Sequence, residues 1–268
     1  MSQEFKNRIV TVTDCTDVAA NEIRAVLVSE LEKLGKADKV EVEPFVLAKE
    51  FSLENGAFLV RLMADNYNPD NTTFLVILNP LRTNRTDRAR IVGQTQKGFK
   101  FVGENTGTLS WLIQDFGVRE IYESNKVGLD GKTFISFGGK YVHAPVAARV
   151  AAGFDLKTLG SDFDKNRITK LNLKDGTVLH IDNFGVPKIF GGFESSLKEG
   201  DLVDIYVNEE RKLSAVFTDS MKNLPDDTWA IYRGSSLNNL PEIGKVRSLE
   251  TARELGVKIG DVVSWKKA

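Results

Sequence analysis

The amino-terminal half of the chain, from Arg8 to Ala152, alternates short apolar runs with amphipathic stretches. The run RIVTVT at Arg8–Thr13 predicts a buried strand, and the next stretch, Ala20–Leu34, carries apolar residues at helical spacing. The run FLVIL at Phe74–Leu78 is uncharged, which is typical of a strand covered on both faces of its sheet. This alternation predicts an α/β domain with a mostly parallel sheet.

Local signals set the bounds of the other elements expected in this half. Gly35 follows the first helix, at the position where a positive φ costs glycine little. Pro145 lies in the first turn of the last helix, where its missing N–H is tolerated. The remaining expected elements are strands at Val40–Leu47 and Glu120–Tyr122, a hairpin of Ala89–Thr95 with Lys100–Val102, and helices at Leu53–Asn66, Leu109–Phe116 and Pro145–Ala152.

The residue pattern of the chain changes after Gly153. Short strand-like runs are separated by turns that contain Gly, Pro, Asp or Asn, and only Leu249–Leu255 looks helical. We predict a small all-β domain there, built as a barrel or a sandwich. The expected organisation is an α/β domain at residues 1–152, a connection at 153–169 and a β-barrel-like domain at 170–268. The expected strands of the second domain are Val178–Asp182, Leu202–Val207, Leu213–Phe217 and Trp229–Tyr232.

Composition excludes several classes of protein. The 268 residues carry 36 Lys and Arg against 37 Asp and Glu, so the net charge of −1 offers no basic surface for nucleic acid. One cysteine and two histidines exclude a disulfide framework, a cysteine-cluster metal site and a histidine-rich zinc site. The longest uncharged apolar runs are too short to span a bilayer, and no signal peptide is apparent. We expect a cytoplasmic protein without nucleic-acid, membrane or metal binding.

Polar residues at strand ends are the first candidates for a site, because ligands of α/β proteins bind outside the carboxyl ends of the strands. Asp14 follows the first predicted strand in the segment TDCTD, and its carboxylate could accept hydrogen bonds from both hydroxyls of a ribose. The alternative is that Asp14 or Asp17 caps the following helix.

Asn79 ends the third predicted strand and opens a loop that carries Arg82, Arg85 and Arg88. Three arginines on one strand-end loop could hold a carboxylate or phosphate, and a solvated loop is the alternative. The segment Ser136–Gly139 supplies backbone N–H groups just before a helix, a weak signal for anion binding. No P-loop or GxGxxG fingerprint is present.

The remaining chemistry-bearing residues have ordinary structural explanations. Asp182 ends a predicted strand and forms a turn with its neighbours in HIDNFG. His143 and His180 lack the Ser or Cys nucleophile signatures of a catalytic base. Cys15 has no histidine partner in a recognisable motif, so thiol catalysis is not expected.

A series of short segments, spread over nearly the whole chain, carries a resemblance to a known family. The segments are Thr13-Asp14, Phe51–Phe58, Phe74–Pro80, Phe101–Gly107, Phe116–Glu123, His143–Gly153, Ile181–Gly185 and Leu255–Asp261. Each segment alone is a weak signal, but their order is specific. On this basis the chain resembles the S-adenosyl-L-methionine (SAM) hydroxide adenosyltransferase family, relatives of the fluorinase and chlorinase.

The resemblance implies a fold and an assembly. Members of the family join an amino-terminal α/β domain to a carboxyl-terminal β-barrel. They form trimers and bind SAM between the first domain of one subunit and the second domain of the next. We therefore expect a homotrimer with its site between subunits. The expected partner is a small adenosyl ligand, with SAM as substrate or ligand and no cofactor.

The resemblance also implies ligand-binding residues in the first domain. Asp14 falls where the family has its ribose-binding aspartate. Phe137 is expected beside Asp14 and Asn79 at one edge of the sheet, and Gly139 aligns with the small residue beside the halide site of the halogenases. These positions form the first half of the expected ligand site.

The second half of the expected ligand site lies in the second domain. Asp182 and Phe184 fall in the motif that contacts the methionine and adenine parts of SAM. Ser235 and Ser236 lie near the loop that holds the amino-acid end. Val186 replaces an asparagine of the family, so one expected hydrogen bond to the ligand is missing.

The reaction centre departs from the family pattern, an Asp-Arg-His set. Asn79 stands at the aspartate position, Arg88 is the best match for the arginine, and the histidine position is Gly138. Lys140 and Tyr141 replace the Arg-Asp pair that follows the histidine. Asn79 cannot take up a proton and Gly138 has no side chain, and the loss of a general base typically costs about 10²–10⁴-fold in rate.

Two functional hypotheses follow. The first is an adenosyl transferase that either hydrolyses SAM with weakened activity or transfers the adenosyl group to halide. Asn79 and Arg88 are its catalytic candidates. The second is a non-catalytic protein that binds SAM, adenosine or a similar nucleoside. His143 lies on the far side of the predicted helix start from Gly138 and is not expected to replace the lost base.

Overall fold

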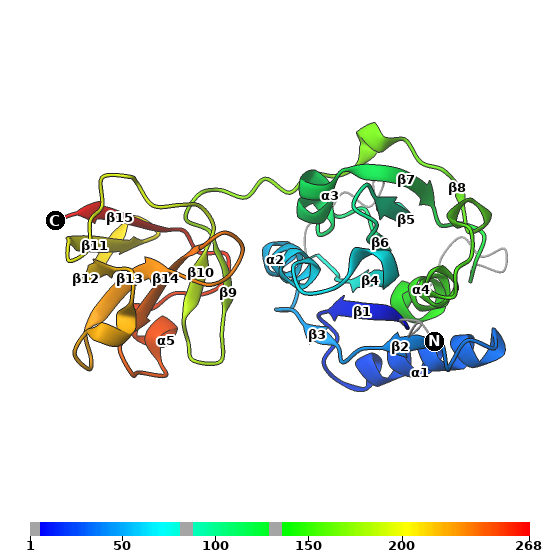
Figure 1. Ribbon diagram of the computed structural model, residues 1–268, viewed down its shortest axis with the longest axis horizontal. Coiled ribbons are helices and arrows are strands. Elements are labelled where there is room, and N and C mark those ends of the chain that lie inside the picture. Colours follow the sequence, from blue (N-terminus) through cyan, green and yellow to red (C-terminus); the bar gives the residue numbers. More distant parts are fainter. Residues whose placement is uncertain (1–5, 81–87, 129–135) are drawn as a thin grey trace, which may run out of the picture. The chain divides into compact units, whose positions relative to one another are not determined.

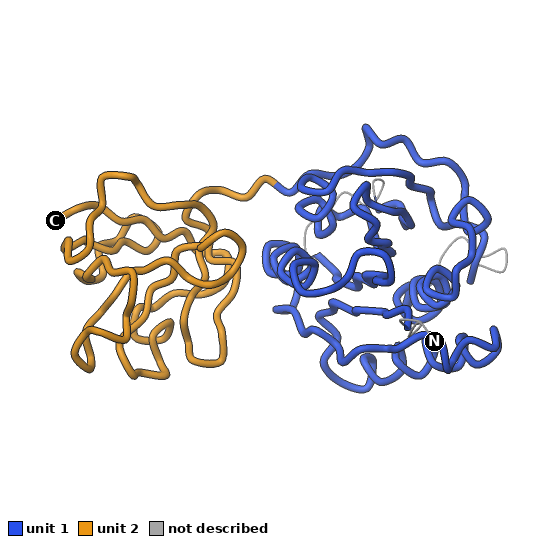
Figure 2. Tube along the Cα trace, in the orientation of Figure 1, with its two compact units in different colours: residues 1–171 blue, residues 172–268 orange. Residues whose placement is uncertain are grey.

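The computed structural model describes residues 6–80, 88–128 and 136–268. The chain divides into two compact units, unit 1 (Met1–Leu171) and unit 2 (Asn172–Ala268), coloured separately in Figure 2. The segment 153–169, expected as a connection, belongs to unit 1 and adds a strand to its sheet. Within the described residues, no helix is long and apolar enough to cross a membrane.

Unit 1 is built on a mixed sheet whose strands run in the order β2-β1-β4-β6-β5-β7-β8, with β3 also paired to β1 (Figure 1). The pairs β1–β2, β1–β3, β1–β4 and β4–β6 are parallel, and β5, β7 and β8 pair antiparallel. The strands are β1 (Asn7–Thr13), β2 (Val40–Val42), β3 (Val46–Leu47), β4 (Thr72–Ile77), β5 (Arg90–Thr95), β6 (Lys100–Glu104), β7 (Val118–Glu123) and β8 (Ser161–Asp162). The predicted α/β class with mostly parallel strands is confirmed.

Helices cover both faces of this sheet (Figure 1). α1 (Val18–Lys33) packs beside α4 (Ala144–Ala151) on one face, and α2 (Leu53–Ala64) packs beside α3 (Ser110–Phe116) on the other. Ile9 and Leu75 point into the core under α1 and α4, so their neighbours along each strand face the other layer. Side chains of both faces of β1 and β4 are fully buried, which explains the uncharged run FLVIL.

Two differences from the expected bounds have local causes. Residues Val40–Leu47 were expected as one strand, but Pro44 has no N–H to donate, and the run splits into β2 and β3. The last helix is preceded by a π-helical turn, Gly139–His143, so helical backbone begins before the residue predicted from Pro145. Short 3-10 turns lie at Pro69–Asn71, Leu156–Thr158, Lys165–Arg167 and Met221–Asn223.

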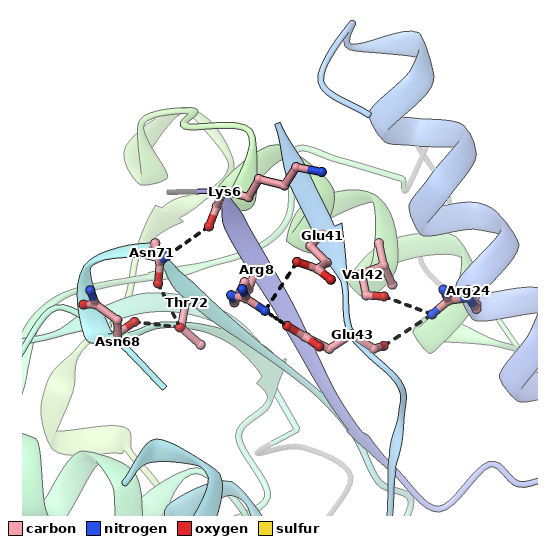
Figure 3. Close-up of polar contacts among 9 residues, drawn as sticks. All are labelled: Lys6, Arg8, Arg24, Glu41, Val42, Glu43, Asn68, Asn71 and Thr72. Carbon is pink, nitrogen blue, oxygen red and sulfur yellow. Dashed lines mark hydrogen bonds and ion pairs between the residues drawn. The ribbon is translucent and has the colours of Figure 1, made fainter. Parts of the chain in front are cut away.

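The amino end of the sheet in unit 1 is held by paired polar groups, which we call the amino-end cluster (Figure 3). Arg8, at the start of β1, forms ion pairs with Glu41, on β2, and with Glu43, just beyond it. Arg24, on α1, donates to the carbonyls of Val42 at 3.1 Å and Glu43 at 3.3 Å. These contacts tie α1 and β2 to the centre of the sheet.

Unit 2 contains one curled sheet, with strands in the order β15-β11-β12-β13-β14-β10-β9. All pairs are antiparallel except β12–β13. The Val178 N–H donates to the Asp261 carbonyl at 2.9 Å, so the two edges of the sheet approach each other and form a half-barrel. The elements are β9 (Val178–Ile181), β10 (Pro187–Ile189), β11 (Leu202–Val207), β12 (Glu210–Thr218), β13 (Trp229–Arg233), β14 (Pro241–Lys245), α5 (Thr251–Leu255) and β15 (Val263–Lys267).

The strand-rich class predicted for unit 2 is confirmed, but three of its strands were not expected from the sequence. β10 and β14 each begin with proline, and β14 contains Gly244, so neither shows the alternation of a typical strand. β15 ends in exposed lysines, which obscure the alternating pattern of a strand. Pairing with neighbouring strands, and not local propensity, makes these segments extended.

Candidate functional site

A cavity of about 670 Å³ opens at the carboxyl end of the sheet in unit 1, where β1 and β4 end. Its wall contains Asp14, Asn79, Arg88, Phe137 and Gly139. The expected meeting of residues from separate strand ends at one edge therefore occurs. Arg82 and Arg85, the other arginines of the candidate loop, lie outside the described residues.

Asp14 does not cap the helix that follows it, which was the alternative explanation for this residue. Asp17 caps α1, because its Oδ1 accepts the N–H of Ala19 at 2.9 Å. Asp14 Oδ2 instead accepts the N–H groups of Phe51 at 3.2 Å and Asn79 at 3.4 Å. Its Oδ1 has no hydrogen-bond partner within the described ranges. The carboxylate is thus oriented by two backbone donors, and its Oδ1 is unpaired among the described residues.

Phe51 reaches Asp14 through an unusual backbone conformation that no sequence pattern indicates. Its φ is 60°, in the left-handed region that residues other than glycine rarely adopt. This conformation presents the Phe51 N–H to Asp14. The ring itself is 45% exposed, so burial of the side chain does not explain the strained backbone.

Asn79, Arg88 and Glu104 form a connected group on the cavity wall. Arg88 donates from Nη2 to Asn79 Oδ1 at 3.3 Å and from Nε to Glu104 Oε2 at 2.6 Å. Since β5 pairs antiparallel to β6, with Arg90 opposite Glu104, the start of β5 lies at the same edge as the ends of β4 and β6. Glu104 balances the charge of Arg88, and Arg88 fixes the orientation of the Asn79 amide.

Two adjacent glycines at the start of the helical segment have different surroundings. A Cβ atom added at Gly139 would lie 2.8 Å from Ile77 Cγ2, so this glycine permits close approach of the helix to β4. Among the described residues, a Cβ atom added at Gly138 would meet only Arg90 Nε, at 3.8 Å, an ordinary van der Waals distance. At the position of the family's histidine, the described residues therefore leave room for a Cβ atom.

His143 also lines the cavity, which corrects the expectation of a purely structural residue. Its side chain is nearly fully buried, and neither ring nitrogen has a hydrogen-bond partner among the described residues. Burial lowers the pKa of His143 to about 3, with further lowering by the positive charges of Arg90 and Arg88. The imidazole is therefore neutral at pH 7. The π-helical turn places His143, and no sequence signal predicts that turn.

Cys15, which follows Asp14 in the cavity wall, is a weak candidate for chemistry. Burial raises the pKa of its thiol, which keeps the sulfur protonated near neutral pH. In the described parts of the chain, no group of three His, Cys, Asp or Glu side chains could hold a metal ion.

The candidate residues of unit 2 gather near the hairpin of β9 and β10. Asp182 Oδ1 accepts the N–H groups of Phe184 at 3.0 Å and Val186 at 2.9 Å, so this carboxylate does shape the turn. Its Oδ2 lies 3.7 Å from Lys188 Nζ, which also binds Glu242 Oε1 at 2.6 Å. Phe184 is 55% exposed at the tip of the hairpin.

A second part of this unit follows β13. Ser235 is exposed and Ser236 is buried in the segment between β13 and β14. The neighbouring Tyr232 has its pKa raised by burial and by the negative charge of Glu242. Burial lowers the pKa of His180, with a further contribution from Lys188. Lys188 thus links Glu242, on β14, to Asp182 at the end of β9.

Comparisons with known proteins bear on both units. Residues 9–160 match the model of the SAM hydroxide adenosyltransferase N-terminal domain. A protein of Methanocaldococcus jannaschii named (R)-S-adenosyl-L-methionine hydrolase is 27% identical over 184 residues, which cover 66% of this chain and 64% of that protein. The aligned region is thus less than two thirds of the length of that relative.

Two solved structures share the fold. An uncharacterized conserved protein from Thermotoga maritima has a TM-score of 0.79 at 19% identity and covers 96% of this chain and 100% of its own. A conserved hypothetical protein from Thermus thermophilus has a TM-score of 0.71 at 21% identity and covers 97% of this chain and 100% of its own. At these identities the likeness concerns the fold alone.

Proposed function

Because this chain belongs to the SAM hydroxide adenosyltransferase family, we propose that the cavity of unit 1 binds the adenosyl group of SAM or a related nucleoside. The observation that carries this proposal is the Asp14 carboxylate, held by two backbone N–H groups with Oδ1 left for a ligand. A carboxylate in this arrangement accepts hydrogen bonds from the 2′- and 3′-hydroxyls of a ribose. A volume of about 670 Å³ is sufficient for a nucleoside.

The reaction proposed for this site is slow hydrolysis of SAM to adenosine and methionine. A water oxygen attacks C5′ of the ribose, the C5′–S bond breaks, and its electron pair leaves on sulfur as the neutral thioether of methionine. The water releases one proton to solvent. Because the sulfonium is already a good leaving group, the protein contributes mainly by positioning the water and the ribose. Asn79 and Arg88 are the proposed positioning groups.

The rate is expected to be low because, apart from Asp14, which the proposal assigns to the ribose, the described residues of the cavity wall offer no ordinary general base. Asn79 is an amide, Gly138 has no side chain, and Glu104 is paired with Arg88. His143 has a pKa of about 3, which makes it a weak base. These observations favour, as the second candidate function, a protein that binds the nucleoside without turnover. Transfer to halide, which needs no base, is the third candidate.

We extend the proposal to assembly and location. By analogy with the family, Asp182, Phe184, Ser235 and Ser236 would complete the site of a neighbouring subunit in a homotrimer. The exposed Phe184 ring supports this idea, because an aromatic side chain at a hairpin tip can stack on an adenine. A single cysteine supports a cytoplasmic location. Light scattering tests the trimer, and a monomer at micromolar concentration would contradict it.

Mass spectrometry of small molecules released from the purified, denatured protein tests the function. We expect an adenine nucleoside or SAM from the wild-type chain and much less from Asp14→Ala. Incubation with SAM, with and without chloride or bromide, then separates slow hydrolysis from binding alone and from halide transfer. A protein that retains no nucleoside and gains no affinity for added adenosine or SAM would contradict the proposal.

A further inference from the structure

The two carboxylate oxygens of Glu104, a residue of the cavity wall, have different surroundings. Oε2 accepts from Arg88, with Nε at 2.6 Å. Oε1 has no hydrogen-bond partner in the part of the chain that the structure describes, and it is not a buried atom. A carboxylate paired with arginine is ionised and can only accept hydrogen bonds. Glu104 Oε1 is therefore an accessible acceptor in the cavity wall, and a group that binds beside it has to be a donor.

The pairing of the strands fixes how far Glu104 lies from the proposed ribose site. Thr13, the residue before Asp14, pairs with Ile77 in the parallel register of β1 and β4. The parallel register of β4 and β6, extended by two residues from its last pair, places Ile77 beside Glu104. Neighbouring strands lie about 4.8 Å apart, so the ends of β1 and β6 are separated by about 10 Å across β4. This interval leaves room for a ribose between the two carboxylates.

A chain of contacts along the cavity wall connects Asp14 to Glu104. The N–H of Asn79 donates to Asp14 Oδ2 at 3.4 Å, and Asn79 Oδ1 accepts from Arg88 Nη2 at 3.3 Å. Arg88 in turn holds Glu104. C5′ of a ribose lies on the opposite side of the ring from the 2′- and 3′-hydroxyls. A nucleoside that binds Asp14 through these hydroxyls can therefore direct C5′ along this chain of contacts, toward Glu104.

We propose that Glu104 Oε1 accepts a hydrogen bond from the group at C5′ and makes the site specific for a neutral donor there. With adenosine the donor is the 5′-hydroxyl, and with SAM it is the water that attacks C5′ in the proposed hydrolysis. A halide offers no hydrogen and would lie beside a like charge, so Glu104 also disfavours transfer to halide. This inference rests on the proposed function, because it needs the ribose at Asp14.

Isothermal titration calorimetry with the full chain tests the inference by binding alone, without any need for turnover. The probes are adenosine, 5′-deoxyadenosine, which lacks the donor, and 5′-chloro-5′-deoxyadenosine, which carries a halogen in its place. We expect the wild type to bind adenosine at least about tenfold more tightly than either analogue, because hydrogen bonds to charged groups are strong. This comparison among ligands uses the unmodified chain and holds whether or not a variant folds.

Glu104→Gln tests the residue itself. Its side-chain carbonyl can still accept from Arg88, and its NH₂ group then faces the cavity, so a donor replaces the acceptor. We expect the preference for adenosine over the two analogues to fall to within about threefold. Glu41→Gln is the matched control, because it removes a carboxylate paired with Arg8 at the other end of the same sheet. It should keep the wild-type preference.

The outcomes separate failure of the inference from failure of the proposed function. Equal affinity of the wild type for all three nucleosides would overturn the inference and leave the proposed function standing. A preference that survives unchanged in Glu104→Gln, or that is lost equally in Glu41→Gln, would also overturn it. When none of the three nucleosides binds, the proposed function is contradicted, and the inference falls with it.

Discussion

The two ends of the sheet in unit 1 differ in whether their polar side chains are paired. At the amino end, Arg8 pairs with two glutamates and Arg24 donates to two carbonyls (Figure 3). At the carboxyl end, Arg90 Nε and both ring nitrogens of His143 are buried without partners among the described residues, and Arg90 Nε lies 3.8 Å from the position of a Cβ added at Gly138. The same kinds of residue therefore stabilise the fold at one end and leave a cavity with unmet hydrogen bonds at the other.

This difference separates structural from ligand-binding roles. Leaving a buried donor or acceptor unpaired costs about 1–3 kcal/mol, so such groups persist where another constraint opposes their loss. Asp14 is partly exposed, and backbone N–H groups orient its carboxylate, whereas Asp17 caps α1. Removal of the Asp14 carboxylate at the carboxyl end should therefore weaken ligand binding, and variants at the amino end should change stability alone.

The largest expected effect comes from restoring the missing catalytic groups. Asn79→Asp with Gly138→His should raise SAM hydrolysis by about 10²-fold or more, because it adds a carboxylate and an imidazole at the proposed water position. The described residues leave room for a Cβ atom at Gly138. Chromatographic detection of adenosine released from SAM measures the change. Vigorous hydrolysis by the unmodified protein would contradict the explanation based on Asn79 and Gly138.

Gly139→Ala is the matched control for the added side chain. Its Cβ would crowd Ile77, so we expect a loss of about 1–3 kcal/mol in unfolding free energy with no gain in turnover. Thermal unfolding measures this loss. Equal tolerance of substitutions at Gly138 and Gly139 would contradict the described packing.

Asp14→Ala should weaken adenosine binding by about 10–100-fold, because it removes a charge-assisted contact worth roughly 1.5–3 kcal/mol. Asp17→Ala is its matched control. Loss of that cap should lower the unfolding free energy by about 1 kcal/mol without changing affinity. Calorimetric titration and chemical denaturation measure the two effects. Equal loss of affinity in both variants would remove the distinction between the two aspartates.

Because of His143, we expect the free energy of unfolding to fall as the pH drops below 6.5. Its pKa is about 3 in the folded chain and about 6.5 when unfolded, so below pH 6.5 the unfolded state binds a proton that the folded state does not. The contribution is constant above pH 6.5 and falls as pH drops toward 3, reaching a loss of about 2 kcal/mol at pH 5. Urea unfolding of wild type and His143→Phe at pH 7 and pH 5 should show a smaller loss in the variant.

The smallest effect is expected at the amino-end cluster. Arg8 is partly exposed, so its ion pairs with Glu41 and Glu43 should contribute at most about 1 kcal/mol. Arg8→Ala should lower the unfolding free energy by that amount and leave adenosine affinity unchanged. A change in affinity on Arg8→Ala would contradict the assignment of separate roles to the two ends.

The sequence predicted those parts of the site that follow from strand ends. Asp14 and Asn79 end parallel neighbours, and such ends gather at one edge of a sheet, so their proximity could be expected. Arg90 and His143 could not be predicted. Arg90 reaches the edge because β5 runs antiparallel beside β6, and His143 reaches it through a π-helical turn. Both depend on pairing or packing between elements, which periodicity along the chain does not reveal.

A crystal structure of the protein soaked with adenosine tests the central assignment directly. We expect the ribose hydroxyls within hydrogen-bond distance of the Asp14 carboxylate, in the cavity at the carboxyl end of β1 and β4. Adenosine bound elsewhere, or bound in this cavity with its ribose turned away from Asp14, would contradict the proposed role of Asp14.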